Sequence, residues 1–225
     1  MSVPTDNLSR VSQSSAPGIF ISFEGGDGAG KSTQVRMLAE WFAGHGREVV
    51  TTFEPGDTAL GAQLRELVQH GEDLDPRTEA LLYAADRAHH VTTVVRPALE
   101  RGAVVITDRY LDSSVAYQGS GRALGAEEVE RLSLWVTEGL LPALTVLLDI
   151  DPVAGAARIT RSLDRIERAG DEFHLTVRAA FLARAAADRS GRWLVLDATR
   201  TPAELHADVV ARAEGLLGSR SRVTP

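Results

Sequence analysis

A glycine-rich loop that runs into a lysine and two hydroxyl residues carries the most specific chemistry in this sequence. Gly25, four residues of loop and then the tripeptide Gly30-Lys31-Ser32 have the spacing of a P-loop. Glycines let the backbone turn its N–H groups toward phosphate oxygens, and the following helix directs its positive N-terminal end there. Lys31 is expected at the β- and γ-phosphates, and the Ser32 hydroxyl on Mg²⁺. The residues of this nucleotide-binding loop are Gly25, Gly26, Asp27, Gly28, Ala29, Gly30, Lys31, Ser32 and Thr33.

An aspartate and an arginine directly follow another apolar run. Asp108 and Arg109 come after Ala103–Thr107, and the carboxyl ends of parallel strands form the ligand-binding edge of an α/β sheet. Asp108 can hold the coordination shell of Mg²⁺, often through water. Arg109 offers the paired donors that a second phosphate needs. Taken alone the two residues could also be a surface ion pair, but the P-loop in the same sheet favours the phosphate site.

Five short β-rich runs alternate with helical patterns and must position these residues. Several runs are almost continuously apolar, as in strands covered on both faces. After the glycine loop, Val35, Leu38 and Phe42 recur at helical spacing. This order of elements predicts a parallel α/β sheet and makes a chance glycine-rich turn the weaker alternative. The expected strands are Ile19–Phe23, Glu48–Phe53, Ala103–Thr107, Leu144–Ile150 and Trp193–Leu196.

Helix starts are marked by local signals in the second half of the chain. Asp151 followed by Pro152 is typical of an N-cap with proline in the first helical position. Thr201 and Glu204 have the spacing of a capping box. Between the second and third strands, a long helical stretch carries apolar residues at helical spacing. They include Leu60, Leu64, Leu67 and Val68, then Leu81, Ala84 and Ala85.

Length and composition limit the other possibilities. The 225 residues suit one domain, which we expect over residues 18–218, with a disordered tail at 1–17 and a frayed end at 219–225. A net charge of −7 argues against an extended nucleic-acid interface, and the absence of cysteine excludes disulfides and thiolate metal sites. No apolar run approaches about 18 residues, so no membrane span is expected. The polar start lacks a signal peptide's apolar region, and a cytoplasmic location is expected.

With these motifs in order, the sequence resembles the thymidylate kinase family, enzymes that phosphorylate dTMP with ATP. The resemblance covers residues 19 to about 200. It is more specific than the P-loop alone because it includes a Tyr-Gln-Gly block and an Asp-Arg-Ile-Glu block. The matching blocks are residues 23–33, Glu54-Pro55-Gly56, residues 82–87, Asp108-Arg109-Tyr110, residues 113–119 and residues 163–167.

The resemblance implies a pocket for the thymine base of dTMP. By this match Arg87 hydrogen-bonds the base and Tyr83, one helical turn earlier, stacks on it, while Ser114 and Gln118 also contact it. These residue types suit a base, because a planar base stacks on an aromatic ring and its carbonyl accepts a hydrogen bond from a donor. Spacing alone leaves open that Tyr83 belongs to the core and that Arg87 is a solvated charge.

The same resemblance implies contacts with the sugar and the acceptor phosphate. Tyr117 is expected beneath the sugar, where its bulk disfavours a ribose 2′-OH, and Asp27 at the 3′-OH. Glu54 and Pro55 are expected near the acceptor phosphate and magnesium, and their peptide bond is a candidate for the cis form. Arg109 completes this set.

Two positions depart from the family pattern Arg-Glu-Pro-Gly-Gly. Phe53 stands in place of the arginine, so one phosphate contact needs another donor, for which Arg96 and Arg122 are candidates. Asp57 stands in place of the second glycine, so the turn must be held differently.

A cluster of arginines follows the fourth expected strand. Arg158, Arg161 and Arg165 fall at i, i+3 and i+7, which predicts one face of a helix. By the resemblance, a segment over about 156–171 is a short helical lid that closes on the triphosphate. Arg165 could instead anchor the lid through a carboxylate, and the whole run could be a solvated helix face.

Together these observations predict an α/β P-loop kinase fold of three layers, with a five-stranded parallel sheet flanked by helices and a short helical lid. The expected reaction is ATP + dTMP → ADP + dTDP with Mg²⁺, carried by Lys31, Arg109 and the lid arginines. The resemblance also implies a homodimer. Another nucleoside monophosphate or deoxynucleoside kinase is the alternative. A GTPase switch is disfavoured because the sequence has no Asn-Lys-x-Asp motif.

Overall fold

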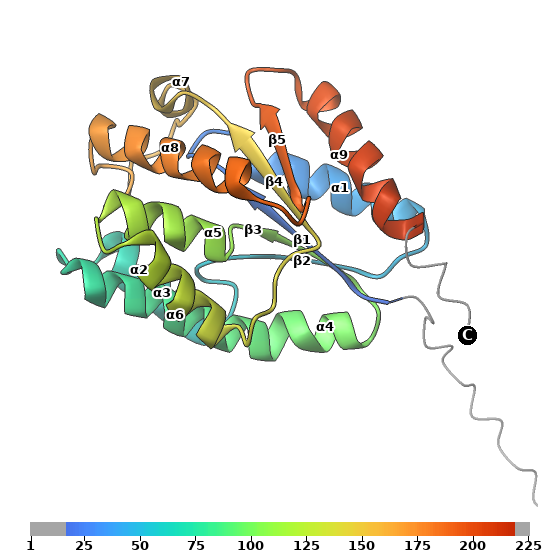
Figure 1. Cartoon of the computed structure of the whole chain (residues 1–225), viewed down its shortest axis with the longest axis horizontal. Coiled ribbons are helices and arrows are strands. Elements are labelled where there is room, and N and C mark those ends of the chain that lie inside the picture. Colours follow the sequence, from blue (N-terminus) through green and yellow to red (C-terminus); the bar gives the residue numbers. More distant parts are fainter. Residues whose placement is uncertain (1–16, 219–225) are drawn as a thin grey trace, which may run out of the picture.

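Five parallel strands form the centre of the protein in a computed structural model that describes residues 17–218 (Figure 1). Their order across the sheet is β2-β3-β1-β4-β5, so the strand before the P-loop lies in the middle. The strands are β1 (Ile19–Glu24), β2 (Val49–Phe53), β3 (Val104–Asp108), β4 (Leu144–Asp149) and β5 (Trp193–Asp197). All five predicted strands are therefore confirmed, with ends that differ by one residue. Apart from Pro17, the expected tail at 1–17 and the frayed end at 219–225 lie outside the described residues.

Helices cover both faces of the sheet and make the predicted three layers. One face carries α1 (Lys31–Gly44) and α9 (Pro202–Gly218), which pack against each other. The other face carries α3 (Pro76–His90), η1 (Val91–Val95), α4 (Arg96–Glu100), α5 (Leu111–Ser114), η2 (Val115–Gly121) and α8 (Asp171–Ala187). On the outside of α3 lie α2 (Ala59–His70) and α6 (Ala126–Val136) (Figure 1). None of the described helices is long and apolar enough to cross a membrane.

The buried core explains why the apolar runs became strands. Every residue of β1 is buried, and β3 and β4 are buried except for their final aspartates. On one face Leu38 and Phe42 of α1 pack on the sheet, as their spacing predicted. On the other face Phe20 of β1 meets Tyr110 in an edge-to-face contact. Removing these side chains from water supplies the main driving force for this layered arrangement.

Both predicted helix caps are present. Asp151 accepts hydrogen bonds from the backbone N–H groups of Val153 and Ala154 at the start of α7 (Pro152–Ala156). Thr201 and Glu204 exchange bonds between side chain and backbone, which is the reciprocal pattern of a capping box.

The expected helix through the arginine cluster is wrong. α7 ends at Ala156, and residues 157–170 form turns and irregular backbone before α8 begins. Asp164 and Glu167 accept hydrogen bonds from each other's backbone N–H groups, at 2.8 and 2.9 Å. These bonds satisfy the backbone locally and stabilise a turn in place of a continuous helix. The three arginines therefore do not share one helix face.

Candidate active site

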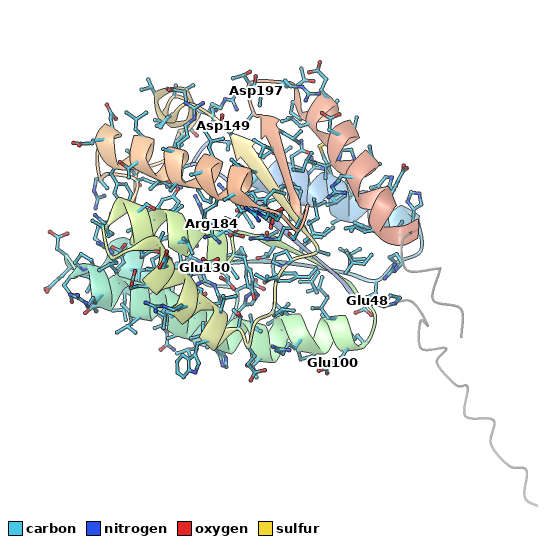
Figure 2. All side chains as sticks on the ribbon, viewed as in Figure 1. Glu48, Glu100, Glu130, Asp149, Arg184 and Asp197 are labelled. Carbon is cyan, nitrogen blue, oxygen red and sulfur yellow. The ribbon has the colours of Figure 1, made fainter. Side chains whose placement is uncertain are left out.

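The candidate site lies at the carboxyl edge of the sheet. Figure 2 shows Asp149 and Asp197 close together at this edge, where β4 and β5 end as register partners, and Glu48 at the opposite edge. A cleft of about 1080 Å³ opens at the carboxyl edge. It is lined by Asp27, Gly28, Gly30, Lys31, Ser32, Thr33, Glu54, Pro55, Tyr83, Arg87, Asp108, Arg109, Ser114, Tyr117, Gln118, Arg158 and Arg161, among others. Most of the predicted site residues are therefore brought to one cavity.

The glycine loop adopts the conformation that its composition allows. Gly25, Gly28 and Gly30 have φ values of 132°, 74° and 93°, which side chains with a Cβ rarely adopt. A Cβ on Gly28 would also collide with the carbonyl oxygen of Gly155 in α7. The Lys31 ammonium donates to the carbonyl oxygens of Gly25 and Gly26, at 3.2 and 3.0 Å. It is thus folded over the loop, at the place where phosphates would compete for it.

Burial lowers the pKa of the loop lysine. Lys31 is buried, and its pKa is lowered first by the loss of water around it and then by the nearby charge of Arg109. Asp108, Asp27 and Glu24 act in the opposite direction. An anion at this position would relieve the unfavourable burial of the ammonium.

Ser32 and Asp108 lie together at the start of α1. The Ser32 hydroxyl donates to Asp108 Oδ2 at 2.9 Å, so both oxygens point to one place. A hydroxyl and a carboxylate are ligands suited to Mg²⁺, which keeps several waters and binds phosphate oxygens as well. The donor set therefore fits the magnesium site that the sequence predicts.

Arg109 joins the P-loop to the acceptor side of the cleft. Its backbone has φ of 70°, and its guanidinium donates to Asp27 Oδ1 at 2.6 Å and to the Gly25 carbonyl at 3.1 Å. The same group lies over the ring of Tyr117, 5.0 Å from its centroid, and bonds its hydroxyl at 3.2 Å. Burial alone would raise the pKa of Asp27, but Arg109 and Lys31 offset this and hold it below its ordinary value. The cluster thus keeps a carboxylate beside a half-buried cation.

Glu24 is a site residue that the sequence reasoning missed. It is fully buried and accepts hydrogen bonds from the Tyr110 backbone N–H and the Ser113 hydroxyl, at 2.9 and 2.5 Å. Burial, together with the charge of Asp112, raises the pKa of Glu24 to about 8. The available signal was a carboxylate inside an otherwise apolar strand, which needs a partner. Its bonds hold the turn that carries Arg109.

Glu54 and Arg87 form a buried ion pair on the acceptor side. Arg87 Nε donates to Glu54 Oε2 at 2.7 Å, and Arg87 Nη2 donates to the Ser114 hydroxyl at 3.0 Å. His90 Nδ1 lies 2.8 Å from Glu54 Oε1, a contact that the sequence reasoning did not find. Burial alone would raise the pKa of Glu54, but Arg87 and His90 hold it below its ordinary value. The Glu54–Pro55 peptide bond is cis.

The two departures from the family pattern have structural counterparts. Phe53 lies under the guanidinium of Arg65, at 5.7 Å from ring centroid to Cζ, and Arg65 donates to the Pro55 carbonyl at 2.8 Å. Arg65 lines the cleft. Asp57 accepts a bond of 2.6 Å from the Thr52 hydroxyl, which holds the turn in a way that glycine could not.

The two arginines suggested as replacements lie elsewhere, so both suggestions are wrong. Arg96 donates to the Thr137 carbonyl at 2.7 Å and pairs with Glu138. Arg122 pairs with Glu79. Of the described residues, Arg65 is the arginine that adjoins the Phe53 position inside the cleft.

The residues that the resemblance predicts at the base also line the cleft. Tyr83 is half-buried on α3, one turn before Arg87. Gln118 of η2 is buried and donates to Glu79, and Glu79 is another residue that the sequence did not reveal. Tyr117 packs edge-on against Phe173 and Phe181.

The three arginines after β4 have three different environments. Arg158 donates to the carbonyl oxygens of Ala198 and Gly28, at 3.0 and 3.4 Å, and so reaches the P-loop. Arg161 makes a bidentate ion pair with Glu167, at 2.6 and 2.8 Å, and is largely exposed. Arg165 turns away and pairs with Glu79 at 2.8 Å. This last contact matches the alternative in which Arg165 anchors the segment through a carboxylate.

The central parallel sheet, the glycine loop with its lysine, and the Ser32–Asp108 pair together define a P-loop nucleotide-binding enzyme. The arginines that line the cleft beside the loop are typical of a phosphotransferase.

Comparison with known proteins gives the family within that class. The family model for thymidylate kinase matches residues 23–209. A protein named thymidylate kinase from Leifsonia xyli is 57% identical over 96% of this chain and 99% of its own length. One from Bifidobacterium longum is 54% identical over 82% and 91%. The crystal structure of thymidylate kinase from Ehrlichia chaffeensis has a TM-score of 0.73 at 30% identity, covering 88% of this chain and 99% of that one. The chain belongs to the thymidylate kinase family and is an enzyme of the kinase class.

Proposed function

We propose that this protein transfers the γ-phosphoryl group of ATP to dTMP and yields ADP and dTDP, with Mg²⁺. The observation that carries the proposal is one continuous cleft that joins the P-loop to a second, cationic pocket. Arg109 lies between the two halves, within reach of both phosphate groups. The family of the chain points to the same substrates.

The reaction needs positioning and charge neutralisation more than it needs a base. The phosphate of dTMP is mostly ionised at neutral pH, so one of its oxygens can attack the γ-phosphorus directly. Lys31 and Arg109 offset the negative charge of the transferring group, and Arg158 and Arg161, which line the same cleft, contribute further positive charge. Mg²⁺ held by Ser32 and Asp108 would supply further neutralisation when bound. The attacking and leaving oxygens are then held in line.

The acceptor pocket suits a pyrimidine deoxynucleotide. Arg87 is held by Glu54 through Nε, and its Nη2 group donates to Ser114 and the Tyr110 carbonyl. Its Nη1 group donates to Ser133 and keeps one hydrogen for a base carbonyl. Tyr83 offers an aromatic face, and Tyr117 with Asp27 meets the sugar. We also propose that Arg65 contacts the acceptor phosphate in place of the arginine absent at Phe53. Among the described residues it has no carboxylate partner, so its charge is available to an anion.

A coupled assay of ADP release tests the proposal directly. We expect turnover with dTMP, weaker turnover with dUMP, and almost none with dCMP or thymidine. Rapid turnover with thymidine would show a deoxynucleoside kinase, which needs a carboxylate base for the hydroxyl. A preference for dCMP would assign the acceptor pocket to another base.

We also propose that the protein works as a homodimer in the cytoplasm. Support for the dimer comes from large apolar side chains that remain exposed on α2, α3 and α6, three helices that pack side by side (Figure 1). They are Leu60, Leu67, Leu81 and Trp135. Such side chains on neighbouring helices are typical of a surface that a second copy covers.

A further inference from the structure

The side-chain amide of Gln118 has a defined orientation toward the cleft. Gln118 is 2% exposed, lines the cleft, and donates through Nε2 to Glu79 Oε1 at 2.9 Å. Its Oε1 accepts no hydrogen bond from a described residue. This oxygen is also not one of the fully enclosed polar atoms without a partner, so it keeps some exposed surface. The amide carbonyl of Gln118 therefore opens into the cleft while its NH₂ group points away.

Glu79 makes this orientation obligatory. Its carboxylate is 0% exposed and receives bonds from Arg122, at 3.3 and 3.2 Å, and from Arg165 at 2.8 Å, besides the one from Gln118. Two guanidinium groups stabilise its negative charge, and an ionised carboxylate can only accept hydrogen bonds. A Gln118 amide turned the other way would place two acceptor oxygens against each other in a buried site. Such repulsion is costly there, because no water can relieve it.

We propose that Glu79 is a positioning residue that sets the choice of acceptor base through Gln118. Thymine and uracil carry an N–H donor at ring position 3, whereas cytosine carries a lone pair at that position. A carbonyl oxygen held in place by Glu79 accepts from the N3–H of thymine and repels the N3 of cytosine. Arg87 supplies the donor for the neighbouring carbonyl at position 4, where cytosine has an amino group. This inference rests on the proposed function, since it assumes that the base lies against Gln118.

A site with a fixed acceptor discriminates more strongly than one whose polar groups can turn. Sites built around a hydrogen bond reject ligands that cannot make it, because the buried group is left unpaired. If position 79 could both donate and accept, the Gln118 amide could turn over and serve either base. The negative charge of Glu79 is therefore the feature that selects thymine over cytosine.

The test is the substitution Glu79→Gln, with kcat/KM measured for dTMP and for dCMP. We expect the ratio of kcat/KM for dTMP to kcat/KM for dCMP to fall by about tenfold or more, through a higher KM for dTMP and a lower KM for dCMP. The kcat with saturating dTMP should change much less. Arg122→Met is the matched control, because it removes one cation from Glu79 and leaves the contact with Gln118. It should lower the melting temperature but keep the dTMP to dCMP ratio.

Two outcomes overturn the inference while dTMP turnover by the wild-type protein keeps the proposed function intact. One is an unchanged ratio in a folded Glu79→Gln protein. The other is an equal fall in both variants, which would mean that loosened packing is the cause. Absence of dTMP turnover in the wild-type protein would instead reject the proposed function.

An isosteric ligand covers the case in which Glu79→Gln does not fold. The 3-deaza analogue of dTMP has C–H in place of N3–H and is a planar 4-hydroxy-2-pyridone, in which the oxygen at position 4 can still accept a hydrogen bond from Arg87. We expect it to bind the wild-type protein about tenfold more weakly than dTMP in calorimetric titration, with ATP affinity unchanged. Equal affinity for the two ligands would show that Gln118 does not present an acceptor to the base, and would overturn the inference.

Discussion

Arg109 is the residue at which the two halves of the cleft meet. Its guanidinium contacts the P-loop through Gly25 and Asp27 and the acceptor side through Tyr117. Its left-handed backbone is held because the next residue, Tyr110, donates its N–H to buried Glu24. A side chain that contacts both halves of the cleft is thus positioned by Glu24, which does not itself line the cleft. This arrangement limits the movement of the cation during transfer.

Arg87→Lys should weaken the use of dTMP while sparing the ATP site. Lysine keeps a positive charge beside buried Glu54, so the fold avoids an unpaired carboxylate. It lacks the planar fork, however, and cannot reach Glu54, Ser114 and a base carbonyl together. We expect the KM for dTMP to rise about tenfold, which corresponds to the loss of one good hydrogen bond. Calorimetric titration of ATP should give an unchanged affinity, and a fall in ATP affinity alone would place Arg87 in the wrong half of the cleft.

Tyr117 should enforce the choice of deoxyribose. Tyr117→Ala opens space for a 2′-OH, so the preference for dTMP over ribothymidine monophosphate should narrow by about tenfold in kcat/KM. Tyr117→Phe is the control, because it keeps the ring against Phe173 and Phe181 and removes only the hydroxyl. The phenylalanine variant should keep the sugar preference. An unchanged ratio in the alanine variant would remove Tyr117 from the sugar pocket.

The residues that the sequence revealed are those whose signal is local. The P-loop and the Asp108-Arg109 pair could be predicted because their roles follow from spacing along one strand and one turn. Glu79, His90 and Arg65 could not, because their partners lie far away in the sequence, and Glu24 gave only the signal of a carboxylate at the end of an apolar strand. Glu79, for example, meets donors from positions 118, 122 and 165. Only the packing of α3 against η2 and the segment after α7 brings these groups together.

At the scale of elements, the segment of residues 157–170 connects the ATP side of the cleft to the acceptor side. Arg158 reaches Gly28 in the P-loop, whereas Arg165 bonds to the Val68 carbonyl of α2 and to Glu79 of α3. The segment therefore extends from the P-loop to α2 and α3 without forming a helix. The i, i+3, i+7 spacing of arginines predicted a helix because it took no account of their separate acceptors, which are backbone carbonyls for Arg158 and carboxylates for Arg161 and Arg165. Strands were easier to predict, since burial on both faces leaves a continuous apolar run.

Arg158→Ala and Arg161→Ala should each lower kcat more than they weaken ATP binding. Both side chains line the same cleft as Lys31, and a cation that acts on the transferring group contributes more in the transition state than in the ground state. We expect kcat to fall about tenfold or more in each variant, with the affinity for ATP changed severalfold at most. Arg168→Ala is the control, because the Arg168 side chain is exposed and donates to the Leu163 backbone carbonyl rather than to a carboxylate among the described residues. Wild-type kcat in both single variants and in the double variant would show that the segment is a solvated surface.

At the scale of the whole molecule, the two ends of the site are carried by opposite layers. The P-loop leads into α1 on one face of the sheet, whereas Tyr83, Arg87 and Gln118 come from helices on the other face. Only the carboxyl edge of the sheet lets groups from both layers meet. The three-layer fold thus creates a cleft that neither layer could form alone.

A charge at Trp135 should break the proposed dimer. Trp135 is 78% exposed on α6, which is unusual for so large an apolar side chain. Light scattering after gel filtration should give twice the chain mass for the wild-type protein and a smaller average mass for Trp135→Glu. Val153→Glu, on α7 beside the P-loop, is the control and should keep the wild-type mass. A monomeric wild-type protein would reject the dimer.

The central claim is that the P-loop lysine carries phosphoryl transfer to dTMP. The most direct test is the rate of dTDP formation from ATP and dTMP by the wild-type protein and by Lys31→Ala. Lys31 lines the cleft, so its removal leaves the apolar core intact. The melting temperature of the variant should therefore stay within a few degrees of the wild-type value, which corresponds to a change of about 1 kcal/mol in the free energy of unfolding. We expect the rate to fall about 100-fold or more, because charge stabilisation of the transferring group is lost. A folded Lys31→Ala protein with near wild-type turnover would contradict the account.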